Sequence, residues 1–249
     1  MDVISHFAAR FERTREEELS IEEYLAECKC NRVAYASAAE RMLQAIGEPQ
    51  TVDTRNDPRL SRLFANKVIK IYPAFAEFYG MEDAIEQVVS YFRHAAQGLE
   101  EKKQILYLLG PVGGGKSSIA ERLKQLMQEV PFYAIKGSPV NESPLGLFDA
   151  TEDGPILEKE YGIPRRYLQR VLSPWAVKRL DEFGGDIRQF KVIKRYPSVL
   201  KQVGIAKTEP GDENNQDISS LVGKVDIRKL ETFSQDRSEE HTSELQSLV

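Results

Sequence analysis

Residues 105–118 read Ile105-Leu106-Tyr107-Leu108-Leu109-Gly110-Pro111-Val112-Gly113-Gly114-Gly115-Lys116-Ser117-Ser118, and this stretch decides the fold class. Its second part fits the pattern G-x-x-x-x-G-K-[ST], the P-loop. The apolar run before the glycines predicts a buried parallel β-strand. Apolar residues then recur at helical spacing from Ile119 to Met127. Strand, loop and helix in this order predict an α/β P-loop core with a parallel sheet.

The residue types of this loop suit the phosphates of a nucleotide. Consecutive glycines let the backbone N–H groups point at phosphate oxygens, and the following helix presents its positive end to them. Lys116 can reach the β- and γ-phosphates of ATP, and the Ser117 hydroxyl is the expected Mg²⁺ ligand. The predicted nucleotide-binding residues are Gly110, Pro111, Val112, Gly113, Gly114, Gly115, Lys116, Ser117 and Ser118.

The adenine ring needs a second, mostly apolar surface. In many P-loop proteins the segment before the first strand covers this ring. Tyr79, Gly80 and Ile85 are candidates for this contact, although packing in the protein core explains the same residues equally well.

Composition narrows the class of protein. The chain has 249 residues, 34 basic and 39 acidic, so its net charge of −5 gives no support to broad nucleic-acid binding. The sequence has no apolar run of membrane-spanning length, and its first residues lack the apolar core of a signal peptide. We therefore expect a cytoplasmic protein that binds neither nucleic acid nor membranes. Cys28 and Cys30 are expected to be reduced thiols rather than zinc ligands.

The rest of the chain alternates helical and extended patterns. Residues 1–47 are predicted to be helical, with a capping box that starts a helix after Ser20. Residues 48–80 form a turn-rich connection, and a further helix is expected to end near Gly98. Two strands are predicted, at residues 132–135 and 190–196, on either side of a mostly helical stretch.

ATP hydrolysis requires more than this phosphate-binding loop. P-loop enzymes that hydrolyse ATP hold Mg²⁺ with a second motif, an apolar strand that ends in acidic residues. Asp181-Glu182 is the only suggestive pair, but the residues before it show helical spacing and contain Lys178 and Arg179. The catalytic acidic residues therefore stay unassigned.

Several segments carry a resemblance to a known family. They are 35–42 (YASAAERM), 57–62 (DPRLSR), 75–82 (FAEFYGME), 90–104 (SYFRHAAQGLEEKKQ), 110–118, 161–168 (YGIPRRYL) and 207–217 (KTEPGDENNQD). From residue 1 to about 236 the chain resembles the N-terminal part of PrkA-type bacterial serine protein kinases. The resemblance implies an AAA+ ATPase fold, ATP and Mg²⁺ as cofactors, and a parent serine/threonine kinase acting on a protein substrate. A homo-oligomer of AAA+ type is a further expectation.

Family members are more than twice as long, so the acidic motif, the sensor residues and the arginine finger are expected after residue 236. The residues from Arg237 to Ser247 instead resemble a translated sequencing adapter. We therefore predict three parts: residues 1–50, an N-terminal helical segment; residues 51–236, an AAA+ P-loop domain incomplete at its C-terminal side; and residues 237–249, a tail derived from the adapter.

The predicted function is that of the ATP-binding part of a PrkA-like serine protein kinase. Because no acidic motif is found, this chain is expected to bind ATP without turning it over. Two alternatives stay open. One is a nucleotide-gated scaffold or remodelling ATPase without kinase activity. The other is a small-molecule P-loop kinase, for which Arg165-Arg166 is the only hint of a basic lid.

Overall fold

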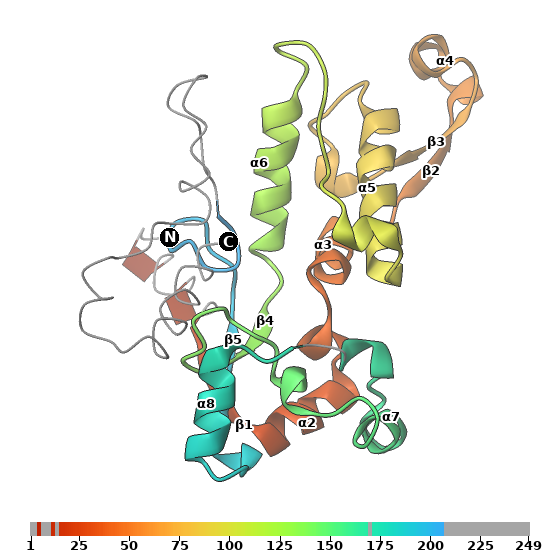
Figure 1. Cartoon of the computed structure of the whole chain (residues 1–249). Helices are drawn as coiled ribbons and strands as arrows, with labels where there is room; N and C mark the ends of the chain where they lie inside the picture. The colour runs from red at the N-terminus through yellow and green to blue at the C-terminus, as the bar shows by residue number, and fades with distance from the viewer. Residues whose placement is uncertain (1–3, 6–10, 13–14, 169–170, 207–249) are drawn as a thin grey trace. The chain divides into compact units, whose positions relative to one another are not determined.

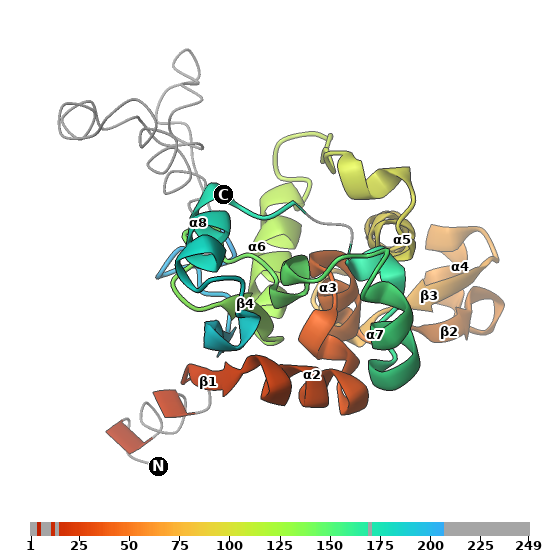
Figure 2. The same cartoon turned by 60° about the horizontal axis from the view of Figure 1, so that its bottom comes forward.

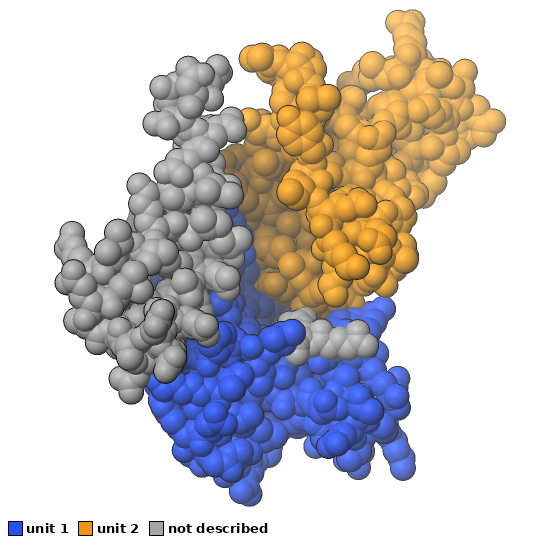
Figure 3. Space-filling view, in the orientation of Figure 1, with its two compact units in different colours: residues 1–35, 131–249 blue, residues 36–130 orange. Residues whose placement is uncertain are grey.

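The computed structural model describes residues 4–5, 11–12, 15–168 and 171–206. The chain divides into two compact units (Figure 3). The first combines residues 1–35 with residues 131–249, and the second is the continuous segment 36–130. Each unit has its own cluster of buried apolar side chains. The predicted boundaries at residues 50 and 236 stay predictions, and the predicted adapter tail lies outside the described residues.

The helices and strands of each unit are labelled in Figures 1 and 2. The first unit contains β1 (Glu17–Ser20), α2 (Ile21–Cys30), β4 (Phe132–Ile135), α7 (Gly154–Tyr161), α8 (Pro174–Glu182) and β5 (Lys191–Arg195). The second unit contains α3 (Ala38–Ile46), β2 (Gln50–Asp53), α4 (Pro58–Phe64), β3 (Val68–Ile71), α5 (Glu82–Gln97) and α6 (Lys116–Met127).

The sheet of the first unit is antiparallel, in the order β1-β5-β4. Leu19 lies opposite Val192, and Ala134 lies opposite Ile193. The strands predicted at residues 132–135 and 190–196 are therefore confirmed as β4 and β5. Residues 17–20, predicted to be helical, form the edge strand β1 instead. Its acidic side chains explain the pairing, because Glu17 accepts a 3.0 Å hydrogen bond from Lys194 of β5.

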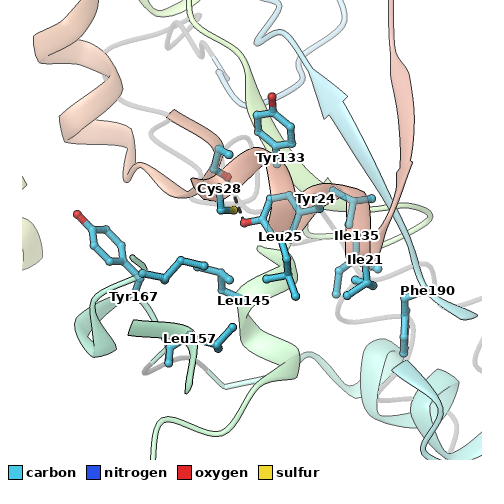
Figure 4. Close-up of a cluster of buried hydrophobic side chains, with 14 residues drawn as sticks. Ile21, Tyr24, Leu25, Cys28, Tyr133, Ile135, Leu145, Leu157, Tyr167 and Phe190 are labelled. Carbon is cyan, nitrogen blue, oxygen red and sulfur yellow. Dashed lines mark hydrogen bonds between the residues drawn. The ribbon is translucent and has the colours of Figure 1, made fainter. Parts of the chain in front are cut away.

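The core of the first unit collects around α2 (Figure 4). The capping box predicted after Ser20 is confirmed, because Ser20 and Glu23 cap each other across the first turn. The helix then buries Tyr24, whose hydroxyl donates a 3.1 Å hydrogen bond to the carbonyl oxygen of Ala34. The ring of Tyr24 also lies 5.7 Å from the ring of Tyr133 on β4, so helix and sheet share one aromatic contact.

Three helices carry the core of the second unit. α3, α5 and α6 pack together through apolar residues such as Met42, Val89 and Leu123. Helix α5 ends at Gly98, where φ is +84°, as the sequence predicted. The helix predicted after the P-loop is confirmed as α6, so the loop is followed by a helix as the motif requires.

The connection at residues 48–80 contains a hairpin that the turn-rich sequence did not predict. β2 and β3 pair in antiparallel register, and α4 lies at the far end of this hairpin in both Figures 1 and 2. Ionic contacts join β3 to α5, because Lys70 donates a 2.7 Å hydrogen bond to Glu86. The same carboxylate accepts a 2.5 Å hydrogen bond from the buried Tyr72, whose hydroxyl also accepts from Arg93.

The parallel sheet predicted around the P-loop is not formed in the described residues, because every strand pair there is antiparallel. The segment 105–109, predicted as a buried strand, is not part of a sheet. Its side chains still alternate. Leu106 and Leu108 pack against the core of the second unit, whereas Ile105, Tyr107 and Leu109 are 91%, 78% and 83% exposed. A strand needs backbone partners on a neighbouring strand, and none of the described residues supplies them.

Candidate nucleotide-binding site

The predicted P-loop folds into a glycine-dependent turn. Gly113 and Gly115 have φ values of +78° and +74°, a conformation that side chains disfavour. Between them, a β-carbon on Gly114 would lie 3.1 Å from the carbonyl oxygen of Pro111. The amide of Gly114 donates a 3.2 Å hydrogen bond to this same oxygen, which closes the turn. All three glycines are therefore required by the backbone of the loop.

Helix α6 begins directly at the end of this turn, at Lys116. Its N-cap is Gly115, which has no side chain that could cap the helix. The amide of Ile119 donates a hydrogen bond to the carbonyl oxygen of Gly115. The first N–H groups of a helix have no partner within the helix. Ser117 and Ser118 of this first turn are exposed, so the turn is accessible to a ligand at the place where phosphates are predicted to bind.

The ammonium group of Lys116 lies over the mouth of the loop. It donates hydrogen bonds of 2.7 Å and 2.5 Å to the carbonyl oxygens of Gly110 and Pro111. The positive charge is thus held at the loop by neutral backbone oxygens. A phosphate oxygen is a stronger acceptor because it is charged. A bound nucleotide would therefore compete favourably for this lysine.

Two contacts tie the P-loop helix to the segment before α5. Arg122 of α6 donates a 2.7 Å hydrogen bond to the carbonyl oxygen of Ala74. Met81 packs against the loop, because a β-carbon on Gly115 would lie 3.0 Å from its sulfur. The segment that contains the predicted adenine-binding residues Tyr79 and Gly80 is therefore attached to the P-loop at both ends.

A hollow of about 460 Å³ adjoins the P-loop on this side. It is lined by Glu77, Phe78, Gly115, Ser118, Glu121, Arg122 and Gln125. Tyr79, next to it in the chain, is 79% exposed, and Gly80 has a φ of +77°. Ile85, the third adenine candidate, is 3% exposed and belongs to the core. Residues from both segments thus line one hollow next to the phosphate-binding turn.

Glu77, Phe78, Met81 and Arg122 did not stand out in the sequence. Arg122 acts through a carbonyl oxygen that is 48 residues away in the chain, and no local pattern encodes such a contact. Phe78 is next to Tyr79 in the chain, and packing in the core explains an aromatic residue there equally well. The predicted adenine contacts Tyr79 and Gly80 lie in the same segment, so the sequence indicated this segment but not these particular side chains.

The other candidate residues lie in the first unit. Asp181 and Glu182 belong to α8, so the pair is helical, and Glu182 forms an ion pair of 2.5 Å with Arg179. Arg165, suggested as part of a lid, pairs with Glu158 at 3.6 Å. Within the described ranges, no group of three His, Cys, Asp or Glu side chains could hold a metal ion.

The two cysteines differ in environment and are both free. Cys28 is buried in the α2 core, and burial raises the pKa of its thiol to about 12. Cys30 is exposed. Among the described helices, none is long and apolar enough to cross a membrane.

Comparison of the sequence with known proteins identifies the family of this chain. The chain is 66% identical over 239 residues to the serine/threonine kinase YeaG of Escherichia coli K12, covering 94% of this chain and 37% of that protein. It is 32% identical over 249 residues to the ATP-dependent protease PrkA of Bacillus subtilis, covering 94% of this chain and 36% of that protein. No solved structure matches the chain. The PrkA AAA domain family matches residues 19–244, and the chain therefore belongs to this family.

Proposed function

We propose that the 36–130 unit binds ATP together with Mg²⁺ at its P-loop. One observation carries this proposal: the glycine turn leads into a helix without a side-chain cap, and Lys116 is held at its mouth. This arrangement brings backbone N–H groups, the positive end of a helix and the Lys116 cation together at one place. Together these groups match the closely spaced charges of a triphosphate.

The residues present fit both cofactors. The exposed Ser117 hydroxyl, in the first turn of α6, would be a ligand of Mg²⁺, which neutralises phosphate charge when it is bound. The base would enter the hollow between the P-loop helix and Phe78, with Tyr79 and Gly80 beside it. The exposed ring of Tyr79 offers a face on which a purine could stack.

The side-chain pattern of segment 105–109 supports the proposal of a parallel sheet. One face of this segment packs on the core, and its other face exposes Ile105, Tyr107 and Leu109. Such alternation between two apolar faces is what a strand buried on both sides requires. We propose that the segment becomes the P-loop strand when further strands of the domain pair with it.

The chain spans little more than a third of the length of the curated relatives it matches. These relatives are named a kinase and an ATP-dependent protease, and both names imply the use of ATP. We propose that the whole protein is a cytoplasmic serine/threonine kinase. In this proposal the P-loop unit supplies the ATP, and the phosphate goes to serine on a protein substrate. A homo-oligomer is part of this proposal, whereas nucleic acid and membranes are not among its partners.

A nucleotide-gated scaffold or remodelling ATPase is the second candidate, favoured because the acidic pair Asp181-Glu182 lies on the helix α8 rather than at the end of a strand. Under either proposal this chain alone binds ATP without turnover. A small-molecule kinase is less well supported, because Arg165 is engaged with Glu158 on its own unit.

The test is a calorimetric titration of the chain with ATP and Mg²⁺. Replacing Lys116 by alanine should raise the Kd for ATP at least tenfold, because a hydrogen bond to a charged group contributes about 1.5–3 kcal/mol. Lys103→Ala removes an equal charge from an exposed position and should change nothing. Equal ATP affinity of wild type and Lys116→Ala would reject the site. Steady phosphate release by wild type above the Lys116→Ala background would reject the claim of binding without turnover.

A further inference from the structure

We propose that Arg122 is a positioning residue for the base of the bound nucleotide, an inference that rests on the proposed ATP site. Arg122 lies in the second turn of α6, after the P-loop residues 110–118, and it is only partly buried. Its side chain lines the hollow of about 460 Å³ beside the P-loop. Arg122 therefore belongs to the base side of the site rather than to the phosphate-binding turn.

The guanidinium of Arg122 joins α6 to the proposed base-binding segment, residues 74–81. Its Nε atom donates a 2.7 Å hydrogen bond to the carbonyl oxygen of Ala74, 48 residues earlier in the chain. A charged donor forms a stronger hydrogen bond than a neutral one. At the other end of the segment, Met81 packs against Gly115. The segment is thus fixed to the P-loop helix at both ends, and Arg122 supplies the polar attachment.

The same guanidinium orients Gln125, one turn further along α6. Its Nη1 atom donates a 3.2 Å hydrogen bond to the side-chain oxygen of Gln125. A carboxamide has one acceptor oxygen and one NH₂ group with two donors. Because Arg122 engages the oxygen, the NH₂ group is left as the donor, and it donates to no described residue. Gln125 also lines the hollow, so this group can donate to a ring nitrogen of the base.

The charges of the hollow suit a base rather than phosphates. The carboxylates of Glu77 and Glu121 line it together with the single guanidinium of Arg122. Lys124 balances one carboxylate, because its ammonium group donates a 2.6 Å hydrogen bond to Glu121. A polyphosphate would meet no excess of positive charge here, whereas Lys116 and the start of α6 offer it at the P-loop. Loss of Arg122 should therefore weaken contacts of the base and leave the phosphates bound.

The experiment compares Mg²⁺–ATP with Mg²⁺–tripolyphosphate, which has the phosphates but no base. Calorimetric titration of the whole chain gives both Kd values, and the change in their ratio between variants reports the base alone. Arg122→Met removes every donor of the side chain. It should weaken ATP binding about tenfold and leave tripolyphosphate binding unchanged. Gln125→Met, at an exposed position, keeps the bond from Arg122 to Ala74. It should weaken ATP binding several-fold, again without an effect on tripolyphosphate.

Arg62→Met is the matched control, because it removes an exposed arginine of the same unit that does not line the hollow. It should leave both Kd values unchanged. Equal weakening of ATP and tripolyphosphate binding in Arg122→Met would overturn the inference, as would ATP binding that this variant leaves intact. If circular dichroism shows that Arg122→Met is unfolded, the same two criteria apply to Gln125→Met. Wild type that binds neither ligand, or no more tightly than Lys116→Ala, would reject the proposed ATP site itself, and this inference with it.

Discussion

The sulfur of Met81 lies against Gly115, so closely that a β-carbon on this glycine would be only 3.0 Å away from it. Gly115 also has a φ of +74°, and it is the N-cap of the P-loop helix α6. One glycine therefore serves the loop backbone, the helix start and the contact with the segment before α5. Because the three roles coincide, its substitution should affect both the stability of the fold and the binding of a ligand.

We expect Gly115→Ala to destabilise the fold by about 1–3 kcal/mol, through positive φ, and to weaken ATP binding in addition. Gly98→Ala is the matched control, because Gly98 also has positive φ and ends a helix, but has open space around it. Thermal unfolding should show a larger loss for Gly115→Ala, because only its β-carbon would also meet the Met81 sulfur, at 3.0 Å. Titration with ATP should show weakened binding for Gly115→Ala alone, and equal ATP affinity in the two variants would contradict this prediction.

Ser117→Ala should weaken nucleotide binding only when Mg²⁺ is present. The hydroxyl is the expected metal ligand, whereas the backbone N–H groups bind the phosphates without it. Ser118→Ala tests the adjacent hydroxyl, which lines the hollow on the side of the base. Affinities for ATP measured with Mg²⁺ and with EDTA should converge for Ser117→Ala and remain different for Ser118→Ala. A Mg²⁺ dependence that Ser117→Ala leaves intact would remove Ser117 from the metal site.

The carboxylate of Glu86 should make stability depend on pH. Burial opposes its ionisation, but hydrogen bonds from Lys70 and Tyr72 outweigh burial and lower the pKa of Glu86 below its ordinary value of 4.5. A lowered pKa in the folded state means that the stabilisation is complete above pH 4.5 and is lost as the pH falls further. Glu86→Gln should therefore cost about 1–3 kcal/mol at pH 7, and its unfolding free energy should approach that of wild type in acid.

Denaturant unfolding at a series of pH values measures this gap between wild type and Glu86→Gln. Glu100→Gln is a suitable control, because the side chain of Glu100 is 80% exposed and its ion pair with Lys103 is 3.8 Å long. The control should follow wild type at every pH. A gap for Glu86→Gln that stays constant from neutral to acidic pH would show that the charge of Glu86 is not what stabilises the hairpin on α5.

The two thiols should react at very different rates. Cys28 is buried and its pKa is raised to about 12, so little thiolate exists at pH 8, whereas Cys30 is exposed. Ellman's reagent should modify one thiol quickly in the native chain and the second only after denaturation. Cys30→Ser should abolish the fast phase, and Cys28→Ser should leave it unchanged. Two fast thiols in the native chain would contradict the burial of Cys28.

Local patterns in the sequence predicted what is encoded locally. The box at Ser20 predicted the start of α2, the glycine at position 98 predicted the end of α5, and the P-loop pattern predicted α6. Each of these features depends on residues within one or two turns of the chain. The predicted role of the loop in binding ATP stays a prediction, because no ligand contact tests it.

Non-local pairing could not be predicted in the same way. β1 contains two glutamates, a leucine and a serine, which favour no strand by themselves, and its partner β5 lies more than 170 residues further on. The prediction of a strand at residues 105–109 was wrong because a suitable neighbouring strand is missing among the described residues. The composition of this segment suits a strand, but a strand exists only where a neighbour supplies backbone hydrogen bonds, and composition does not supply the neighbour.

The pairing of β1 with β5 also determines the order in which the two units can fold during synthesis. A ribosome releases residues 36–130 as one uninterrupted stretch, so every contact of the second unit is available once residue 130 has left the exit tunnel. The first unit must wait, because Glu17 to Ser20 cannot find their partners until residues 191–195 have been made. Throughout that interval the N-terminal strand is an open edge. Its acidic side chains suit this delay, because charge on an unpaired edge discourages pairing with other nascent chains.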